Sequence, residues 1–175
     1  MMFRIDTASV AGNKNPDWAR AKAEGPIAFA ILRATYGTSV DSQFKAEWPR
    51  VATAGLVRGA YMFLRFPRGG KKVPDPEAQA EAYCKAVDLQ AGKDFPPVLD
   101  VEFPGDGRKE TGMTAGECLL WVLRAYQVLR AHYDTRPIIY TSARVWRDDL
   151  DNMPAPELLP CPLWLARYPF KAGPA

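Results

Sequence analysis

The sequence is poor in the residues that most metal sites and nucleophilic triads use. Its 175 residues include a single histidine, His132, and three widely spaced cysteines, Cys84, Cys118 and Cys161. A single histidine disfavours both a Ser-His-Asp triad and a histidine-rich metal site. The odd number and wide spacing of the cysteines disfavour a disulfide framework and a zinc knuckle. We therefore expect chemistry that needs no metal and no cofactor.

Long apolar runs and a strong charge bias are also missing. No run approaches the ~18–20 apolar residues that cross a bilayer, and the start M-M-F-R-I-D-T-A lacks the apolar segment of a signal peptide. The net charge is +3 and the charges are scattered, unlike the clustered stripe of a nucleic-acid-binding protein. A weak positive charge is compatible with approach to an anionic cell wall. We expect a monomer made in the cytoplasm, with neither membrane insertion nor nucleic-acid binding.

The sequence does contain an alternation of strand and helix patterns. Strands are predicted at 3–6, 27–35, 57–66, 95–103, 138–142 and 163–168, and helices at 16–24, 42–54, 76–90, 115–133 and 143–150. Pro49 should kink or restart the second helix. Asp75 before Pro76, and T-A-G-E at 114–117, are signals of a helix N-terminus. Alternation of this kind predicts parallel strands joined by crossover helices.

Polar or aromatic residues end nearly every predicted strand. These residues are Asp6, 35–37, Arg65, Asp100, Glu102, 140–142, Arg167 and Tyr168. In a barrel the carboxyl ends of all strands converge on the face that holds the active site, whereas an open sheet gathers only a few of them. We therefore favour an α/β fold that is an irregular, small TIM-like β/α barrel with mostly parallel strands. We expect one domain over residues 1–175.

Two carboxylates stand two residues apart in the segment F-P-P-V-L-D-V-E-F at 95–103. On a strand, Asp100 and Glu102 share a face and lie roughly 6.5–7 Å apart. Most glycoside hydrolases use a pair of carboxyl groups that lie roughly 5–9.5 Å apart. Glu102 lies nearer the open end of the barrel and is the better candidate for the acid. The alternative is that both carboxylates pair with arginines at the end of the sheet.

Aromatic residues and one arginine at the strand ends are candidates for substrate binding. Tyr61 and Tyr140 suit either a sugar platform or a core position with a wet hydroxyl. Trp164 is the stronger candidate, since aromatic faces stack on the apolar faces of pyranose rings. Arg33 suits either the binding of a carboxylate or peptide stem, or an internal ion pair with an acid.

Short motifs in a fixed order cover nearly the whole chain. They are R-I-D at 4–6, D-W at 17–18, R-A-T-Y-G at 33–37, A-G-L at 54–56, G-A-Y at 59–61, P-P-V-L-D-V-E at 96–102, Y-T-S at 140–142 and L-W-L-A-R-Y at 163–168. In this order they resemble glycoside hydrolase family 25, the lysozyme-type muramidases often found in phage endolysins. Each motif alone is weak, but the ordered set is specific.

The resemblance implies an irregular β/α barrel that cleaves the β-1,4 bond between N-acetylmuramic acid and N-acetylglucosamine of peptidoglycan. It makes Glu102 the proton donor and Asp100 and Asp6 the supporting carboxylates. Configuration is retained whether Asp100 is the nucleophile or orients the 2-acetamido group of the substrate. The implied sugar-binding aromatics are Tyr61, Tyr140, Trp164 and Tyr168. A phage lysis protein of this kind would reach the bacterial cell wall through holin-type pores.

The chain departs from the family pattern in three places. Tyr36 stands where the family usually has an acid, and Met62 where it usually has histidine. The sequence ends with K-A-G-P-A at 171–175, before the family's W-Q-Y-type strand and one more aspartate. We therefore expect a catalytic barrel without that strand. The alternative is a non-catalytic cell-wall glycan-binding or structural protein that keeps the fold. A chitinase-like enzyme is disfavoured because the D-x-x-D-x-D-x-E motif is absent.

Overall fold

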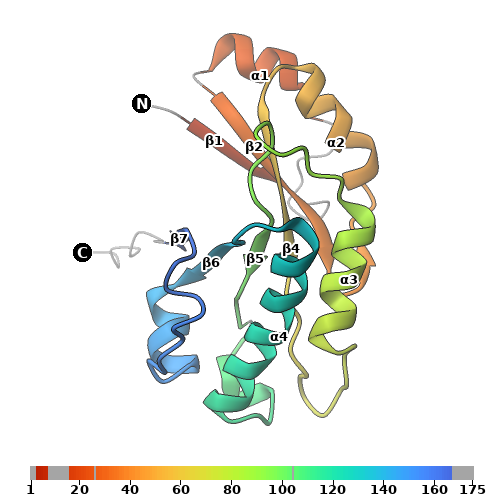
Figure 1. The fold of residues 1–175 in the computed structure, drawn as a ribbon. Coiled ribbons are helices and arrows are strands. Elements are labelled where there is room, and N and C mark those ends of the chain that lie inside the picture. The colour runs from red at the N-terminus through yellow and green to blue at the C-terminus, as the bar shows by residue number, and fades with distance from the viewer. Residues whose placement is uncertain (1–2, 8–15, 26, 104, 167–175) are drawn as a thin grey trace, which may run out of the picture.

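Six parallel strands form one continuous sheet in the computed structural model, which describes residues 3–7, 16–25, 27–103 and 105–166. The strand order is β1-β2-β4-β5-β6-β7, and the short β3 pairs antiparallel with β2 (Figure 1). The strands are β1 (Phe3–Thr7), β2 (Ile27–Tyr36), β3 (Ser39–Val40), β4 (Val57–Phe63), β5 (Val98–Asp100), β6 (Ile138–Ser142) and β7 (Leu163–Ala166). The predicted alternation of parallel strands and crossover helices is confirmed.

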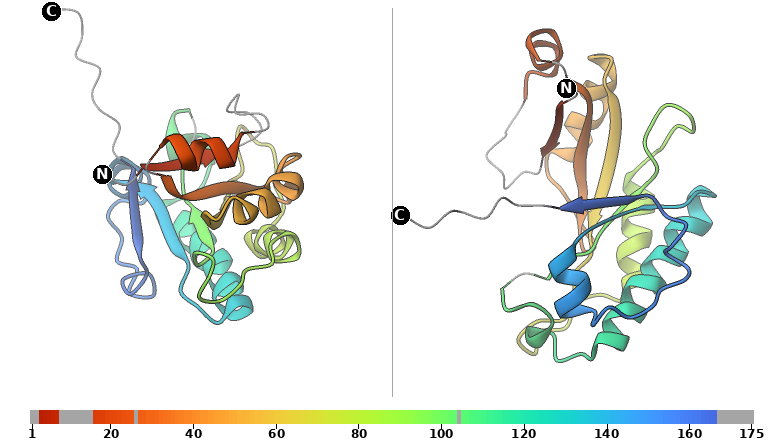
Figure 2. Two further views of the ribbon diagram at one scale, coloured as in Figure 1. Left: turned by 90° about the horizontal axis from the view of Figure 1, so that it is seen from above. Right: turned by 90° about the vertical axis from the view of Figure 1, so that its left-hand side faces the viewer.

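Helices connect consecutive parallel strands, and three of them line one side of the sheet. The helices are α1 (Trp18–Glu24), α2 (Phe44–Thr53), α3 (Pro76–Ala86) and α4 (Ala115–Tyr133), with a 3₁₀ turn η1 (Gly107–Glu110) and a π-helical turn η2 (Val145–Asp149). Figure 1 shows α2, α3 and α4 on that side. Figure 2 shows β7 running across the direction of β1 and β2, so the sheet is strongly twisted. Among the described residues, no helix is long and apolar enough to cross a membrane.

The hydrophobic core lies between the sheet and the helices. Successive side chains of a strand point to opposite faces, and Met62, Leu99 and Ile139 are the buried members of their strands on the helix side. They pack with helical residues such as Tyr83 and Leu129, both fully buried. The alternate strand positions therefore face away from this core.

A β-bulge at Ala34 changes the register of β2. Arg33 pairs with Tyr61 of β4, but Thr35 pairs with Met62, the very next residue of β4. The carbonyl of Ala34 instead accepts a hydrogen bond from the Asp41 N–H (2.9 Å). Tyr36 therefore lies on the same face of β2 as Arg33, although the two residues are three positions apart instead of two. Nothing in the sequence indicated this bulge.

The predicted strand 95–103 is much shorter in the structure. Only Val98–Asp100 is paired as β5, because Pro96 and Pro97 have no N–H to donate to a ladder. Single backbone bonds extend the segment at both ends: Phe95 N–H donates to the Arg58 carbonyl (2.9 Å) and Val101 N–H to the Tyr140 carbonyl (2.9 Å). Glu102 therefore lies two residues beyond the end of the strand, rather than on it.

Other local predictions fared unevenly. Pro49 lies inside α2, which runs without interruption from Phe44 to Thr53, so the helix is not restarted at this residue. Asp75 makes no side-chain capping hydrogen bond to α3, and that helix ends at Ala86 rather than near residue 90. The predicted helix 143–150 is a π-helical turn over Val145–Asp149.

The capping box that opens α4 is confirmed. The Thr114 hydroxyl accepts a hydrogen bond from the Glu117 N–H (3.2 Å), and the Glu117 carboxylate accepts one from the Thr114 N–H (2.7 Å). These bonds lower the pKa of Glu117, with the bond from the Thr114 backbone as the largest cause.

Replacing Thr114 by alanine should destabilise the protein by about 1 kcal/mol, because a helix-terminal N–H loses its acceptor. Urea unfolding measures this as a lower midpoint with an unchanged slope. Thr114→Ser is the matched control, since serine keeps the acceptor and should unfold near the parent's midpoint. Equal losses for both variants would contradict this role of the hydroxyl.

A buried ion pair ties the start of β4 to the loop before β5. Arg58 forms two hydrogen bonds to Asp94 (2.7 and 2.9 Å), and their side chains are only 10% and 4% exposed. The Arg58 guanidinium also lies 4.1 Å from the centroid of the Trp48 ring. Asp94 in turn accepts the Gln90 N–H (2.8 Å). This pair therefore joins α2, β4 and the loop before β5.

Candidate active site

A row of predicted site residues crosses the carboxyl end of the sheet in register. Asp100 of β5 pairs with Phe63 of β4 on one side and with Tyr140 of β6 on the other, and Tyr140 pairs with Trp164 of β7. Residues paired in register on parallel strands point to the same face. That face is the one opposite the helix-packed core, since the intervening Leu99 and Ile139 belong to the core.

The two predicted catalytic carboxylates differ in exposure. Asp100, the last residue of β5, is 5% exposed, whereas Glu102 is half-buried. Between them Val101 is fully buried. The carbonyl of Asp100 accepts the Leu64 N–H (3.1 Å), and Val101 N–H donates to Tyr140. The peptide group between Asp100 and Val101 is thus held by Leu64, just after β4, and by Tyr140 of β6, while Glu102 is the more accessible of the two carboxylates.

The predicted sugar-binding aromatics Tyr140 and Trp164 are in contact. Their ring centroids are 4.9 Å apart at an interplanar angle of 77°, the edge-to-face arrangement that aromatic pairs favour. Both rings are half-buried. Tyr61, also half-buried, lies in β4 two positions before Phe63, so it shares the face of this row. These aromatics therefore lie on the same face as Asp100.

Arg33 makes an internal ion pair. Its guanidinium donates to Asp41 Oδ2 through two nitrogens (3.0 and 2.7 Å), and both side chains are largely buried. This is one of the two roles that the sequence left open for Arg33. Its pairing with Tyr61 in the sheet still places it on the site face, and its part in substrate binding stays a prediction.

Two predicted site residues are described only in part or not at all. The backbone of Asp6 pairs with Ile31 in the ladder between β1 and β2. Tyr168 lies outside the described residues. Their predicted roles, as a supporting carboxylate and a sugar-binding aromatic, stay predictions.

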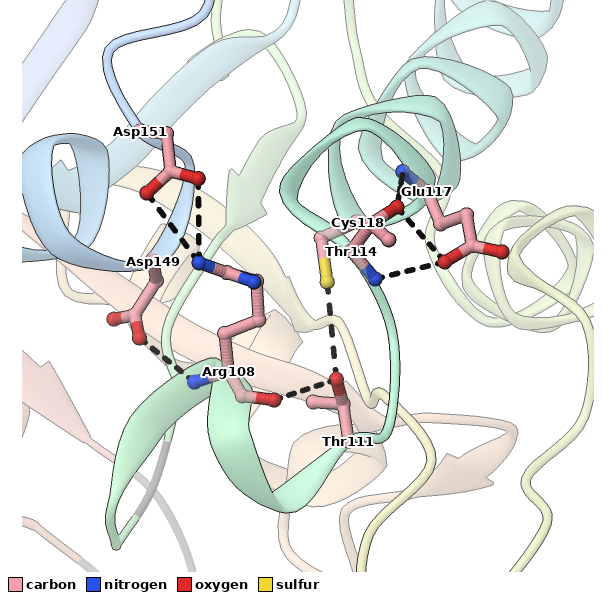
Figure 3. A network of polar contacts seen from close by, with 7 residues as sticks. All are labelled: Arg108, Thr111, Thr114, Glu117, Cys118, Asp149 and Asp151. Carbon is pink, nitrogen blue, oxygen red and sulfur yellow. Dashed lines mark hydrogen bonds and ion pairs between the residues drawn. The ribbon is translucent and has the colours of Figure 1, made fainter.

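The loop that follows Glu102 is braced by the polar network of Figure 3. Asp149 accepts the Arg108 N–H (2.7 Å), and the Arg108 side chain donates to Asp151 (3.3 Å). The Thr111 hydroxyl donates to the Arg108 carbonyl (2.7 Å) and lies 3.9 Å from the Cys118 sulfur. The contacts join η1 to η2 and to the start of α4. They hold the loop between β5 and α4 beside the site face.

Gly107 makes the approach of Asp149 to this loop possible. Its φ is +76°, and a Cβ at this position would lie 2.2 Å from Asp149 Oδ1. A side chain would therefore displace Asp149, which is 4% exposed and also lies 3.4 Å from Arg144. Only glycine fits both the backbone conformation and this contact.

A pocket of about 380 Å³ lies on the other side of β6 and β7 and holds none of the predicted site residues. Ile139, Thr141, Leu163 and Leu165 line it, and these alternate along the strands with Tyr140 and Trp164. The opposite face is the better candidate site, because Asp100, Tyr140 and Trp164 lie there in one row. Across the described ranges, no group of three or more His, Cys, Asp or Glu side chains is arranged to hold a metal ion.

Met62 lies away from the site face. It is fully buried in the core and pairs with Leu99, so its side chain is on the opposite side of β4 from Tyr61. The methionine that replaces the family's histidine therefore fills core volume. Neither Phe63 nor Arg65 is among the predicted site residues, although both follow Tyr61 in steps of two. That spacing was the available signal.

Comparisons with known proteins find a family model, related sequences and similar structures. The family model described as "Glycosyl hydrolases family 25" matches residues 5–174. The chain is 27% identical over 174 residues to "Lysozyme M1" of Streptomyces globisporus, covering 96% of this chain but 55% of that protein. The chain thus spans about half the length of this curated relative.

Two solved structures share the fold. One is a muramidase from Trichobolus zukalii, with a TM-score of 0.77 and 26% identity, covering 97% of this chain and 79% of that one. The other is described as a family GH25 lysozyme from Aspergillus fumigatus, with a TM-score of 0.79 and 25% identity, covering 97% and 77%. The predicted fold class, an irregular and mostly parallel TIM-like α/β fold, is confirmed by this likeness.

Proposed function

Because this chain belongs to glycosyl hydrolase family 25, we propose that it hydrolyses the β-1,4 bond between N-acetylmuramic acid and N-acetylglucosamine in peptidoglycan. The observation that carries the proposal is the in-register row of Asp100, Tyr140 and Trp164 at the carboxyl end of the sheet. Glu102 follows two residues later on the same edge. A sugar bound against the aromatic pair would lie beside both carboxylates.

In this mechanism Glu102 protonates the glycosidic oxygen and Asp100 stabilises the charge that develops at the anomeric carbon. The greater exposure of Glu102 suits a group that exchanges protons with the leaving group and then with water. Asp100, fixed at the strand end by bonds to its carbonyl and to the next N–H, suits a positioned carboxylate. It acts either as nucleophile or by orienting the 2-acetamido group, and both routes retain configuration. Asp6 supports these carboxylates.

The proposal predicts the identity and the anomeric form of the product. Digestion of purified peptidoglycan, followed by borohydride reduction and mass spectrometry, should yield fragments that end in muramitol. Proton NMR during hydrolysis should show the β anomer first. Fragments ending in glucosaminitol would contradict the assignment of the bond, and an initial α anomer would contradict retention.

Peptidoglycan binding without cleavage would favour the alternative, a non-catalytic glycan-binding protein of the same fold. One motive for that alternative was the replacement of histidine by Met62, which the core position of this residue weakens. We further propose that the protein acts in bacterial lysis as a monomer, reaching the wall from the cytoplasm by a holin-type route. Native mass spectrometry tests the monomer, and co-expression with and without a holin tests the route.

A further inference from the structure

The end of β4 leads to an arginine, Arg65, whose backbone is held from both sides. Its N–H donates to Gln79 Oε1 (2.9 Å), and its carbonyl accepts from Gln79 Nε2 (2.9 Å) and Trp121 Nε1 (3.1 Å). Gln79 is fully buried and also donates to the Pro74 carbonyl (2.7 Å). Side-chain hydrogen bonds thus fix the backbone of Arg65, and this lowers the cost of ordering it around a ligand.

The side chain of Arg65 is also positioned. Its guanidinium lies over the Tyr36 ring, 4.9 Å from the centroid. Its stem runs over Gly37, which has a φ of +60° and where a Cβ would come within 2.9 Å of Arg65 Cδ. Tyr36 is itself stacked on Phe63, with centroids 4.9 Å apart and an interplanar angle of 27°.

The Arg65 guanidinium forms no ion pair with a carboxylate within the described part of the chain. Every ion pair found there joins other residues. Arg33, which also lies near the Tyr36 ring (5.7 Å), is neutralised by Asp41. An acid at position 36, as in the family pattern, would neutralise Arg65. With tyrosine at position 36, the positioned guanidinium has no carboxylate partner among the described side chains and lies beside an aromatic ring that is 39% exposed.

Two hollows of about 130 and 370 Å³ meet at Arg65. They share Arg68 and Glu110, which form an ion pair with each other. The smaller hollow is lined by Tyr36, Phe63, Phe66 and Phe103 among others, and the larger by Lys71. Because Glu110 forms an ion pair with Arg68, the unpaired charged residues that line the two hollows are, within the described ranges, Arg65 and Lys71. The hollows therefore combine an aromatic wall with a net positive rim.

The segment that carries the rim is a tight hairpin. Arg68 and Lys71 exchange backbone hydrogen bonds (3.2 and 2.9 Å) around Gly69 and Gly70, whose φ values are +56° and +74°. Positive φ at both central residues is typical of a type I′ turn. Gly69 N–H also donates to the Glu110 carbonyl (2.9 Å). The hairpin is thus fastened to η1, beside the loop that follows Glu102.

This corner lies two strands away from Asp100 in the same row of the sheet. Tyr36 pairs with Phe63, and Phe63 pairs with Asp100. With neighbouring strands ~4.8 Å apart, the backbones of Tyr36 and Asp100 are about 10 Å apart, a distance of the order of a disaccharide. A glycan bound at Asp100 can therefore extend over Tyr36.

We propose that Tyr36 and Arg65 form a subsite for a carboxylate-bearing sugar of the glycan substrate. The sugar packs against the exposed edge of the Tyr36 phenol, and its carboxylate accepts hydrogen bonds from the planar guanidinium of Arg65. This rests on the proposed function and deepens it. Muramyl residues carry a carboxylate, on the lactyl group or in the attached stem peptide, whereas chitin carries none. The subsite thus selects anionic wall glycans over neutral ones.

Binding measurements on three ligands test the subsite without requiring turnover. The ligands are peptide-free muramyl oligomers with a free lactyl carboxylate, muropeptides with stem carboxylates, and neutral chitotetraose. Calorimetric titration at low salt should show that Arg65→Gln weakens the muramyl ligands about tenfold and chitotetraose hardly at all. Tyr36→Glu should act in the same direction, because its carboxylate would pair with Arg65. High salt should reduce the preference of the parent for the anionic ligands.

The matched control is Arg136→Gln, which removes the same charge from an exposed position just before β6, at the amino end of the sheet. It should leave all three affinities unchanged. A loss with peptide-free oligomers identifies the lactyl group as the ligand, and a loss with muropeptides identifies the stem. Equal losses for chitotetraose and muramyl ligands, or none for either, would overturn the subsite.

Failure of the subsite and failure of the proposed hydrolysis are distinguishable. A parent protein that cleaves peptidoglycan but shows no dependence on Arg65 refutes the subsite alone. A protein whose muramyl affinity depends on Arg65, yet which cleaves nothing, refutes hydrolysis and leaves the subsite standing.

Discussion

Replacing Glu102 by glutamine should reduce the release of reducing ends from peptidoglycan by at least about 100-fold, the lower end of what a positioned general acid contributes. Glutamine has nearly the same shape as glutamate but cannot donate a proton to a glycosidic oxygen. Because Glu102 lies beyond the strand and is half-buried, the substitution should leave folding and glycan affinity intact. Reducing-end assays and calorimetric titration measure the two effects separately.

Glu81→Gln is the matched control, because Glu81 is an exposed residue of α3 and does not belong to the row of site residues. This variant should hydrolyse peptidoglycan at the parent's rate. If Glu102→Gln retained the parent's rate, Glu102 would not be the acid. If it unfolded, the residue would have a structural role instead, and the thermal midpoint of the variant would show this.

The second large effect should be on stability. Replacing Asp94 by alanine leaves the Arg58 guanidinium buried without its carboxylate, a change that typically costs about 3–5 kcal/mol. The Trp48 ring over Arg58 offsets part of the charge but accepts no bidentate hydrogen bonds. We expect a large fall in the urea midpoint, with loss of the tie between β4 and the loop before β5.

Asp88→Ala, an exposed position in the same loop region, should change the free energy of unfolding by less than about 0.5 kcal/mol. The double variant Arg58→Met with Asp94→Ala should recover much of the loss, since it removes both charges together. A cost below about 1 kcal/mol for Asp94→Ala alone would mean that solvent replaces the carboxylate, contrary to the burial of the pair.

The sequence predicts the order and type of the main elements because their patterns are local. The capping box at Thr114 and the apolar run before Asp100 depend only on neighbouring residues; the box is confirmed, and the run forms a strand that is shorter than predicted. Element ends were less predictable. The length of β5 depends on which N–H groups find partners on β4 and β6, and two prolines together limit that pairing.

The candidate site divides in the same way. Asp100, Tyr140 and Trp164 could be named as site residues because each lies within a predicted strand. The partners of Arg33 and Arg58 could not, because Asp41 and Asp94 meet them only after loops close. Tyr36 and Arg65 were separate strand-end residues in the sequence. Their contact depends on the bulge in β2 and on Gln79, which is contributed by α3.

The bulge at Ala34 shifts the register of β2 against β4 by one residue. Before it, Arg33 matches Tyr61, and after it Tyr36 matches Phe63, so steps of three on β2 keep pace with steps of two on β4. Thr35, which is fully buried, lies opposite Met62, the place that an unbulged strand would give to Ala34. The position of the Tyr36 ring opposite Phe63 therefore depends on the extra residue in β2, and the two features should occur together in related proteins. In a relative without the extra residue, the aromatic residue opposite the equivalent of Phe63 would have to stand one position earlier in the chain.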